Sequence, residues 1–327
     1  MTTKSKKELD VPKSSASIDQ TKQILITGAG GALAQHVISI LKREYRIVAV
    51  DFRRRVELGE DIPSYKVDFN KRGFEDIFRT YEFDGVLHLG RMGLHEANRT
   101  RRYNMNVLGT QKLFNLCLKY NVHQVLVLST HHVYGADAYN PALLDETFPL
   151  KASELTQDLV DSVELENLST IYKWKHPDLH ITILRPCNIV GPGVRNTISM
   201  LLSQKYAPIL FGFSPLMQFI HVEDMAEAIA TAFSQNRPGI YNVAPDDWVS
   251  YQDALVECGC NRLPILSIPP SLPKFVAKFM NTRSFPEYLV NYFKYPVIID
   301  GSLFRESFKW KPGRSLEEIF SYYREVK

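Results

Sequence analysis

The chain has 327 residues, of which 45% are hydrophobic, 23% charged and 11% aromatic, with 17 Gly and 18 Pro. This composition excludes the collagen-like, disordered and disulfide-scaffold classes, and the chain is long enough to bury a sizeable core. Lys and Arg number 39 against 36 Asp and Glu, a net charge of +3, so nothing in the overall balance demands a nucleic acid or an anionic membrane as partner.

The cysteines point to a reducing compartment. Four cysteines are too few for a disulfide framework in a chain of this length. Cys258-Gly-Cys260 lacks the second ligand pair that a zinc site needs. We therefore expect free thiols, no bound metal and a cytoplasmic protein. No apolar run approaches the ~18 residues of a membrane span, so no membrane-spanning segment is expected.

In chain order, the first 22 residues hold many Lys, Ser and Asp and almost no large apolar side chains, which predicts a disordered tail. From Gln23, short β-branched or aliphatic runs alternate with stretches of helical period, the pattern of a parallel sheet covered by helices. The predicted strands are Gln23–Thr27, Arg46–Val50, Gly85–Leu89, Gln124–Ser129 and Ile181–Leu184. Helices are predicted between them at 32–43, 74–81, 107–120 and 159–174. This order predicts a doubly wound α/β sheet with its ligand site at the carboxyl ends of the strands.

After Arg185, the alternation loosens into shorter elements in a region rich in proline and aromatic residues, which predicts a smaller C-terminal α/β lobe. A helix is predicted at 223–233, and another is opened by the capping pattern that starts at Ser315. The aromatic and basic segment 271–295 is expected to pack within this smaller lobe, with a contact to a membrane surface or a partner as the alternative.

A glycine-rich turn, Thr27-Gly-Ala-Gly-Gly-Ala-Leu-Ala34, joins the first strand directly to a helix. Residues without Cβ let an anion approach backbone N–H groups and the positive end of the helix dipole, so the turn predicts a pyrophosphate site. Asp51 follows at the end of the second strand, close to the ~20 residues after the first glycine that are expected of a carboxylate binding an adenosine ribose. Together these features predict a dinucleotide cofactor.

The identity of the dinucleotide depends on the residues after the second strand. Arg53, Arg54 and Arg55 could contact a 2′-phosphate, which would favour NADP. Asp51 would repel that phosphate. We therefore expect NAD rather than NADP, with the three arginines in a solvated loop.

With these residues placed, the chain resembles the extended short-chain dehydrogenase/reductase family, the NAD-dependent epimerase/dehydratase group, over about 23–323. Further motifs follow in the family's order: Val67-Asp68, His88-Leu-Gly90, Asn106–Thr110, Leu128–Gly135, Arg185–Gly193, Phe219–Asp224 and Gly239–Val243. The resemblance implies a Rossmann-type dinucleotide-binding domain over 23–190, joined by a returning segment of about 218–246, and a substrate or lid lobe from 191–217 and 247–327.

The resemblance also implies the ligand contacts. The cofactor-binding residues would be Gly28, Gly30, Gly31, Ala32, Leu33, Asp51, Phe52, Arg53, Asp68, Phe69, Leu89, Gly90, Arg91, Asn106, Ser129 and Pro186. The substrate contacts would be Thr130, His131, His132, Asn188 and Met217. Family members commonly form homodimers through two helices, here 104–120 and 156–174. Leu108, Leu113, Val163 and Leu168 are candidates for the seam, although each could equally face the sheet.

The chain departs from the family at its catalytic pair. Thr130 matches the catalytic Ser/Thr, but alignment of the Tyr-x-x-x-Lys motif places Asp158 at the tyrosine and Ser162 at the lysine. In the family, the tyrosine exchanges the substrate proton, and the lysine lowers its pKa and holds the nicotinamide ribose. An aspartate is shorter and is ordinarily ionised at neutral pH, so the usual mechanism is not expected. The one Tyr-x-x-x-Lys in the chain, Tyr323 to Lys327, is interpreted as a coincidence.

A second departure concerns the substrate. Asn188 retains the family's nucleotide contact, but Met217 replaces the arginine that meets the diphosphate in nucleotide-sugar members. Because a thioether cannot neutralise a diphosphate, an apolar ligand, or none, becomes more plausible. Four arginines after the third predicted strand are expected to form a solvated loop, with an acidic partner as the alternative: Arg91, Arg99, Arg101 and Arg102.

The sequence therefore predicts a catalytically impaired NAD-binding protein that acts as a nucleotide-dependent binder, regulator or scaffold for a small molecule or protein that it does not identify. The alternative is an active epimerase, dehydratase or reductase that uses Thr130 with His132 or Asp158 as a substitute acid. A third hypothesis, an emptied scaffold, is disfavoured because the glycine turn and Asp51 both persist.

Overall fold

The computed structural model describes residues 22–59, 61–93, 96, 98–265 and 287–327. The predicted N-terminal tail, except its last residue, and the larger part of segment 271–295 lie outside these described residues. None of the helices in the described ranges combines the length and apolar character that crossing a bilayer requires.

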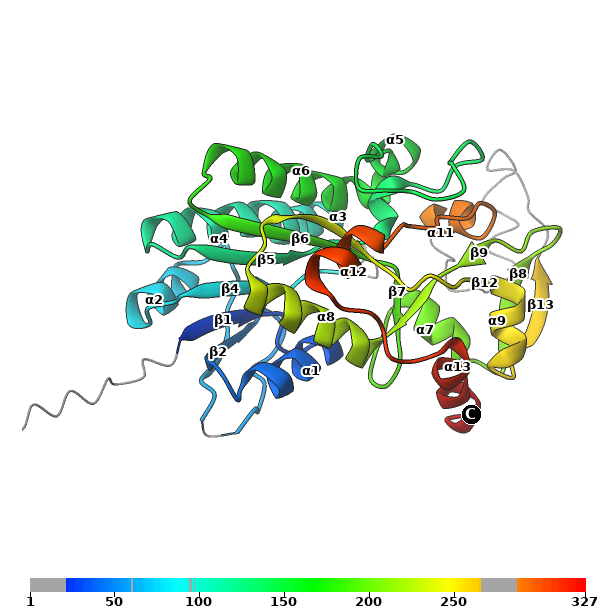
Figure 1. The fold of residues 1–327 in the computed structure, drawn as a ribbon, viewed down its shortest axis with the longest axis horizontal. Helices are drawn as coiled ribbons and strands as arrows, with labels where there is room; N and C mark the ends of the chain where they lie inside the picture. Colours follow the sequence, from blue (N-terminus) through cyan, green and yellow to red (C-terminus); the bar gives the residue numbers. More distant parts are fainter. Residues whose placement is uncertain (1–21, 60, 94–95, 97, 266–286) are drawn as a thin grey trace, which may run out of the picture.

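A seven-stranded sheet with the order β11-β6-β5-β4-β1-β2-β3 forms the centre of the molecule (Figure 1). Every neighbouring pair of its strands is parallel. The central strands are continuous apolar runs because helices cover both of their faces. The strands are β1 Gln23–Thr27, β2 Arg46–Asp51, β3 Ser64–Lys66, β4 Gly85–His88, β5 Gln124–Leu128, β6 His180–Pro186 and β11 Gly239–Val243.

Two layers of helices cover the sheet, as the doubly wound prediction requires (Figure 1). On one face, α1 Ala32–Leu41 packs against α8 Val222–Gln235, and both bury apolar side chains in the same core cluster. On the other face lie α2 Arg72–Thr80, α4 Gly109–Lys119 and α6 Val160–Lys175. The aromatic side chains of α2 and α4 form the centre of the second core cluster, with Phe74 and Phe114 fully buried.

The five predicted strands are confirmed, each with its ends shifted by no more than two residues. The helix predicted at 107–120 begins earlier than expected. α3 Arg99–Tyr103 runs into a π-helical turn, Asn104–Leu108, which continues into α4. This extension is rich in Arg and Asn, so it lacks the apolar period that marks a helix in a sequence. π-helical turns are frequent at functional sites.

The smaller lobe continues beyond the carboxyl ends of the strands and is built from short elements (Figure 1). Three two-stranded sheets pair β7 Asn188–Val190 with β10 Phe219–His221, β9 Leu216–Met217 with β12 Val249–Ser250, and β8 Tyr206–Leu210 with β13 Asn261–Ile265. In the described residues, the remaining α-helices are α5 Ala152–Leu155, α7 Thr197–Leu202, α9 Tyr251–Glu257, α11 Glu287–Tyr292, α12 Ser302–Phe308 and α13 Leu316–Glu325. The predicted capping box is confirmed at the start of α13, where Ser315 and Glu318 bond reciprocally.

Tyr323 of α13 has a structural role in this lobe. Its ring is 1% exposed, its hydroxyl accepts a hydrogen bond from the backbone N–H of Gly191 at 2.9 Å, and it also bonds to Ser199. Lys327 reaches the Cys258 carbonyl instead of a cofactor strand. The Tyr323 to Lys327 spacing therefore belongs to the packing of α13.

Two residues predicted for a dimer seam lie elsewhere. Leu113 and Val163 are 0% and 3% exposed and belong to the two core clusters, so of the two predicted alternatives they face the core and not a dimer seam. Helix periodicity alone did not tell the sheet-facing side of each helix from its outer side. Leu108 is 43% exposed, and Leu168 packs on the edge of the core.

Candidate functional site

The glycine turn after β1 has the backbone that close packing and an anion site both require. Gly28 has φ 73°, and a Cβ on it would lie 2.5 Å from the Cα of Gly90 in the turn after β4. Gly31 is the N-cap of α1, and no side chain of the described residues caps this helix start. The first turn of α1 also lacks an acidic residue. Its N–H groups and dipole are thus available to an anion.

Asp51, at the end of β2, holds the glycine turn from the other side. One carboxylate oxygen accepts the backbone N–H of Gly30 at 3.0 Å, and the other accepts the N–H of Arg53 at 2.8 Å. A Cβ on Gly30 would lie 2.9 Å from that first oxygen, so the position needs glycine. Asp51 is 5% exposed, whereas the three arginines after it are exposed, as predicted.

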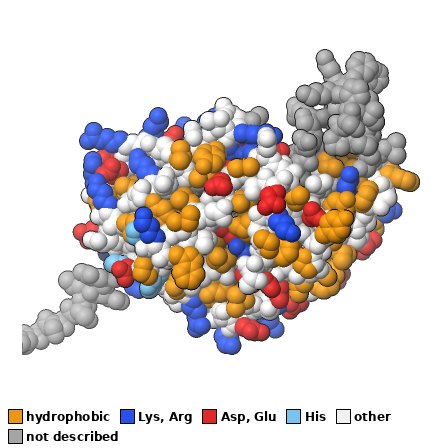
Figure 2. Space-filling model, turned by 90° about the horizontal axis from the view of Figure 1, so that it is seen from above, with side chains coloured by type: hydrophobic (Ala, Val, Ile, Leu, Met, Phe, Trp, Pro, Cys, Tyr) orange, Lys and Arg blue, Asp and Glu red, His pale blue; other side chains and the backbone are white. Residues whose placement is uncertain are grey.

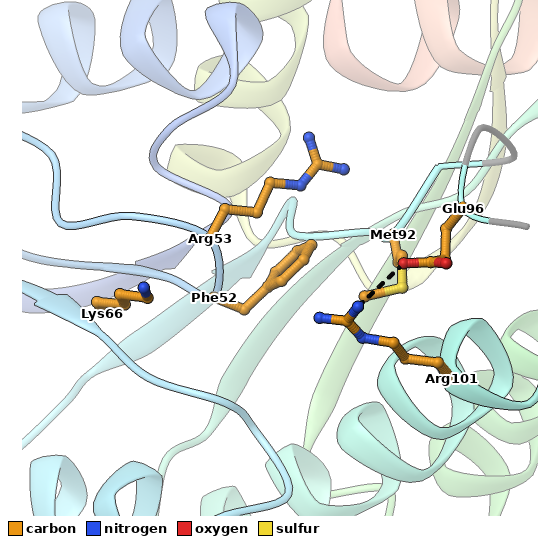
Figure 3. Close-up of a pocket in the computed structure, with 6 residues that line it drawn as sticks. All are labelled: Phe52, Arg53, Lys66, Met92, Glu96 and Arg101. Carbon is orange, nitrogen blue, oxygen red and sulfur yellow. Dashed lines mark hydrogen bonds and ion pairs between the residues drawn. The ribbon is translucent and has the colours of Figure 1, made fainter. Parts of the chain in front are cut away.

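A cavity of about 390 Å³ opens beside this carboxylate at the ends of β2, β3 and β4 (Figure 3). The ring of Phe52 points into it, with Lys66 on one side and the ion pair of Glu96 and Arg101, at 3.3 Å, on the other. Arg53 and Met92 complete the lining. The cavity therefore offers one aromatic face and several charged groups.

A buried chain of hydrogen bonds fixes the turn after β4. Burial, reinforced by the charge of Arg91, lowers the pKa of His88 to about 4, so its imidazole is neutral. The Thr110 hydroxyl donates to a carbonyl in the π-helical turn, so it accepts from His88 Nε2 at 2.8 Å. His88 Nδ1 then accepts from Thr27 at 2.8 Å, and the Thr27 hydroxyl accepts from Gly90 N–H at 3.1 Å. This chain holds the two glycine turns against each other.

Arginines engage both side chains that the sequence alignment predicts at the catalytic positions. Asp158 lies in a 3₁₀ turn just before α6, and its carboxylate pairs with Arg99 at 3.0 Å. Ser162, in the first turn of α6, is 2% exposed, and its hydroxyl accepts from the Arg91 guanidinium at 2.5 Å. Both arginines come from the segment that follows β4.

Arg102 is not part of a solvated loop, and that prediction was wrong. It is 3% exposed in α3 and pairs with Asp161, itself 4% exposed, with 3.3 Å between Nε and Oδ1. Asn106 donates to the other oxygen of Asp161 at 2.5 Å and bonds the backbone of Met92 through both ends of its amide. The ion pair with Asp161 of α6 keeps the Arg102 side chain buried. Arg99 and Arg101 are exposed, as expected.

A second buried ion pair lies one turn further along α6. Glu166 is fully buried and accepts from Arg185 Nε at 2.5 Å, while Ser129 donates to its other oxygen. Arg185 also donates to the Tyr134 hydroxyl at 2.6 Å. Burial raises the pKa of Tyr134 to about 12, so its hydroxyl remains protonated at neutral pH. The structure thus places the Ser129 hydroxyl in a buried network of the fold.

The predicted substrate residues gather around a second, small cavity. His131, His132, Asn188 and Met217 line a space of about 20 Å³ together with Tyr292. Such a volume holds about one water molecule. The Tyr292 hydroxyl donates to the His132 carbonyl at 2.5 Å, which closes one side. The Asn188 amide donates to the carbonyl of Gln218 at 2.9 Å.

The two histidines of this cavity are neutral at neutral pH. Burial lowers the pKa of His131 to about 4, although its bond to the Pro186 carbonyl at 3.0 Å opposes the shift. Burial, together with the electrostatic effect of the neighbouring His131 and Arg91, holds the pKa of His132 well below its usual value. His132 Nδ1 lies 3.1 Å from the Thr130 hydroxyl. A threonine and a neutral imidazole are therefore in hydrogen-bond contact.

Sequence reasoning missed the ion pair of Arg102 with Asp161 and the role of Tyr292 in closing the cavity. The sequence shows four arginines after β4 and acidic residues at the start of α6. Opposite charges on these two segments would have suggested ion pairs between them. Tyr292 lies in segment 271–295, for which the sequence predicted packing within the smaller lobe and no role at this site.

Residues 24–244, more than half of the chain, match the model of the NAD dependent epimerase/dehydratase family, so the chain belongs to this family of extended short-chain dehydrogenases/reductases. An uncharacterized protein of Mycobacterium tuberculosis is 26% identical over 257 residues, 75% of this chain and 67% of the relative. UDP-glucose 4-epimerase of Caenorhabditis elegans is 24% identical over 90% of this chain and 95% of the relative. The structure of dTDP-glucose 4,6-dehydratase from Bacillus anthracis in complex with NAD superposes with a TM-score of 0.74 at 16% identity, covering 93% of this chain and 97% of that one.

Proposed function

We propose that the protein binds NAD and works as a nucleotide-dependent binder, with the family's usual proton-transfer chemistry lost. The observation that carries this proposal is the state of the catalytic positions. Asp158 is paired with Arg99, and Ser162 accepts from Arg91, so neither position offers a phenol or an ammonium to a substrate. Removing a positioned acid–base group costs roughly 10²–10⁴-fold in rate.

The described residues fit NAD. The N–H groups at the start of α1 would bind the pyrophosphate, and the Asp51 carboxylate would bind the adenosine ribose. The cavity beside Phe52 would take the adenine, since an aromatic face can stack on a base. When bound, NAD supplies a nicotinamide that exchanges hydride. NADP is disfavoured because its 2′-phosphate would face the carboxylate of Asp51.

The second cavity supports the loss of sugar chemistry. A volume of about 20 Å³ is far below the roughly 300 Å³ of a small-molecule pocket. Met217 contributes a thioether to it where a diphosphate would need a cation. We therefore propose that the ligand of the smaller lobe, if it enters this cavity, is not a nucleotide-diphosphate sugar.

One contact favours an active enzyme as the second candidate. The Thr130 hydroxyl lies 3.1 Å from His132 Nδ1, the arrangement of a hydroxyl beside a base. With its lowered pKa, His132 can accept a proton but holds it weakly. Asp158 is the poorer substitute, because its carboxylate is tied to Arg99. This candidate predicts turnover that Thr130→Ala abolishes.

We also propose a homodimer through the outer face of α6. Ile171 and Trp174 on this helix are 57% and 75% exposed, and Leu108 lies on the neighbouring helix. Figure 2 views the molecule from above Figure 1, on the side where α6 lies, and shows hydrophobic side chains interspersed with charged ones of both signs. Such a mixed face suits a protein partner better than a nucleic acid.

The NAD assignment is tested by calorimetric titration of Asp51→Ala. Loss of the bonds between a carboxylate and two ribose hydroxyls should weaken NAD binding by at least about 100-fold. The matched control is Asp84→Ala, because Asp84 lies just before β4, at the amino ends of the strands, and accepts the N–H of Gln23 at 2.7 Å. That control should retain NAD affinity. Equal affinity of Asp51→Ala and the native protein would refute the assignment.

A further inference from the structure

Three arginines contact the first two turns of α6. Arg102 pairs with Asp161, and Arg185 pairs with Glu166. Arg91 is a third cation, half-buried, whose guanidinium bonds the hydroxyl of Ser162 at 2.5 Å. Within the described part of the chain, it makes no ion pair of its own. Arg91 therefore lies beside two buried arginine–carboxylate pairs without a carboxylate partner of its own among the described residues.

Most of the hydrogen-bonding capacity of Arg91 is unused. A guanidinium has five N–H donors, and the bond to Ser162 is the one that the described residues provide. Burial lowers the pKa of Arg91, and the charges of Asp161 and Glu166 oppose this shift. A half-buried cation without its own carboxylate is costly unless other acceptors satisfy it. A ligand with oxygen acceptors would supply them.

The Arg91 side chain extends from the glycine turn after β4 to the start of α6. Arg91 directly follows Gly90, which packs on the Gly28 turn, and its guanidinium ends at Ser162 of α6. Its charge also acts on His132, which contacts Thr130. The guanidinium therefore reaches from the turn beside the proposed pyrophosphate site toward α6 and the segment after β5 that holds Thr130 and His132.

We propose that Arg91 replaces the missing lysine: it supplies from the loop after β4 the cation that the family places on α6, and it donates to the hydroxyls of the nicotinamide ribose of NAD. The small side chain of Ser162 leaves room for the guanidinium at the lysine's position. The planar fork of a guanidinium can donate to two neighbouring oxygens at once, as the two ribose hydroxyls require. This inference rests on the proposed NAD binding.

The test compares NAD with AMP, which lacks the nicotinamide ribose. Arg91→Ala should weaken NAD binding by about 10- to 100-fold, the range for loss of a charge-assisted hydrogen bond, and should change AMP binding by less than about twofold. Arg91→Met, which keeps the aliphatic stem, should behave in the same way. Arg99→Ala is the matched control from the same segment and should leave both affinities unchanged.

A double variant that restores a cation at position 162 completes the test. Adding Ser162→Lys to Arg91→Ala should return the NAD affinity to within about threefold of the native value, because the ammonium again stands on α6. NAD affinity that is unchanged or tighter in Arg91→Ala would overturn the proposal, as would a double variant no better than Arg91→Ala alone. Loss of AMP binding in both Arg91 variants would also overturn it, since the effect would then be on the whole site.

The proposed function fails by a different result. Native protein that binds neither NAD nor AMP, or an Asp51→Ala variant that keeps both affinities, would refute the dinucleotide site itself. Normal loss of binding in Asp51→Ala with no effect of Arg91→Ala would refute the role of Arg91 alone.

Discussion

The buried pair of Arg102 with Asp161 stabilises the contact between α3 and α6, and its removal should be costly. Arg102→Met retains an apolar side chain but removes the guanidinium. Asp161, 4% exposed, would then keep the amide of Asn106 as its partner among the described residues. The bond from Arg102 to the Asp158 carbonyl, 2.7 Å long, would be lost as well.

Breaking a buried ion pair by removing one partner costs about 3–5 kcal/mol, because the remaining charge stays buried. A domain of 150–250 residues loses about 2–4 °C of Tm per kcal/mol, so Arg102→Met should lower Tm by roughly 6–20 °C. Arg102→Met combined with Asp161→Leu removes both charges and should recover at least half of that loss.

Thermal unfolding followed by circular dichroism measures these values. The matched control is Arg99→Met, since Arg99 also pairs with a carboxylate before α6 but its side chain is 52% exposed. An exposed pair contributes about 0–1 kcal/mol, so this control should shift Tm by no more than about 4 °C. Equal shifts in Arg102→Met and Arg99→Met would refute the structural role assigned to the buried pair.

Two further predictions concern pH and assembly. The folded pKa of His131 is about 4, below its ordinary 6.5, so on acidification the unfolded chain binds a proton at this histidine before the folded protein does. The neutral, buried His131 therefore contributes to the free energy of unfolding fully above about pH 6.5, and this contribution is lost as the pH falls toward 4. His131→Gln should flatten the pH dependence of the urea unfolding free energy over that range, and an unaltered slope would contradict it. Trp174→Glu should convert the proposed dimer into a monomer in light-scattering chromatography, whereas a native protein that is already monomeric would exclude the dimer.

Local patterns predicted much of the fold and the proximity of the residues in the proposed cofactor site. The strands are apolar runs because the sheet is buried on both faces, and such runs are visible without knowledge of their neighbours. Gly28 and Asp51 belong to one strand–turn–helix–strand unit, so their spacing along the chain predicted that they would lie close together. The structure places them on either side of Gly30.

The contacts at the start of α6 could not be predicted in the same way, because they join residues far apart in the chain. Arg91 and Arg102 each meet a side chain of α6 that follows some 60 to 70 positions later. A run of arginines is most often solvated, and the sequence alone does not show that carboxylates of another helix lie beneath it. The π-helical turn around Asn106 was missed for a related reason, since tertiary hydrogen bonds stabilise it more than apolar periodicity does.

The central claim is that this family member binds its nucleotide without the usual turnover. The most direct test loads the protein with NADH deuterated at nicotinamide C4, adds the small-molecule fraction of source cells and follows the label by mass spectrometry. If the protein binds the nucleotide without turnover, we expect tight binding with the label retained on the nucleotide. Transfer of the label to a metabolite in the native protein, abolished by Thr130→Ala, would contradict it and identify an enzyme with a relocated acid or base.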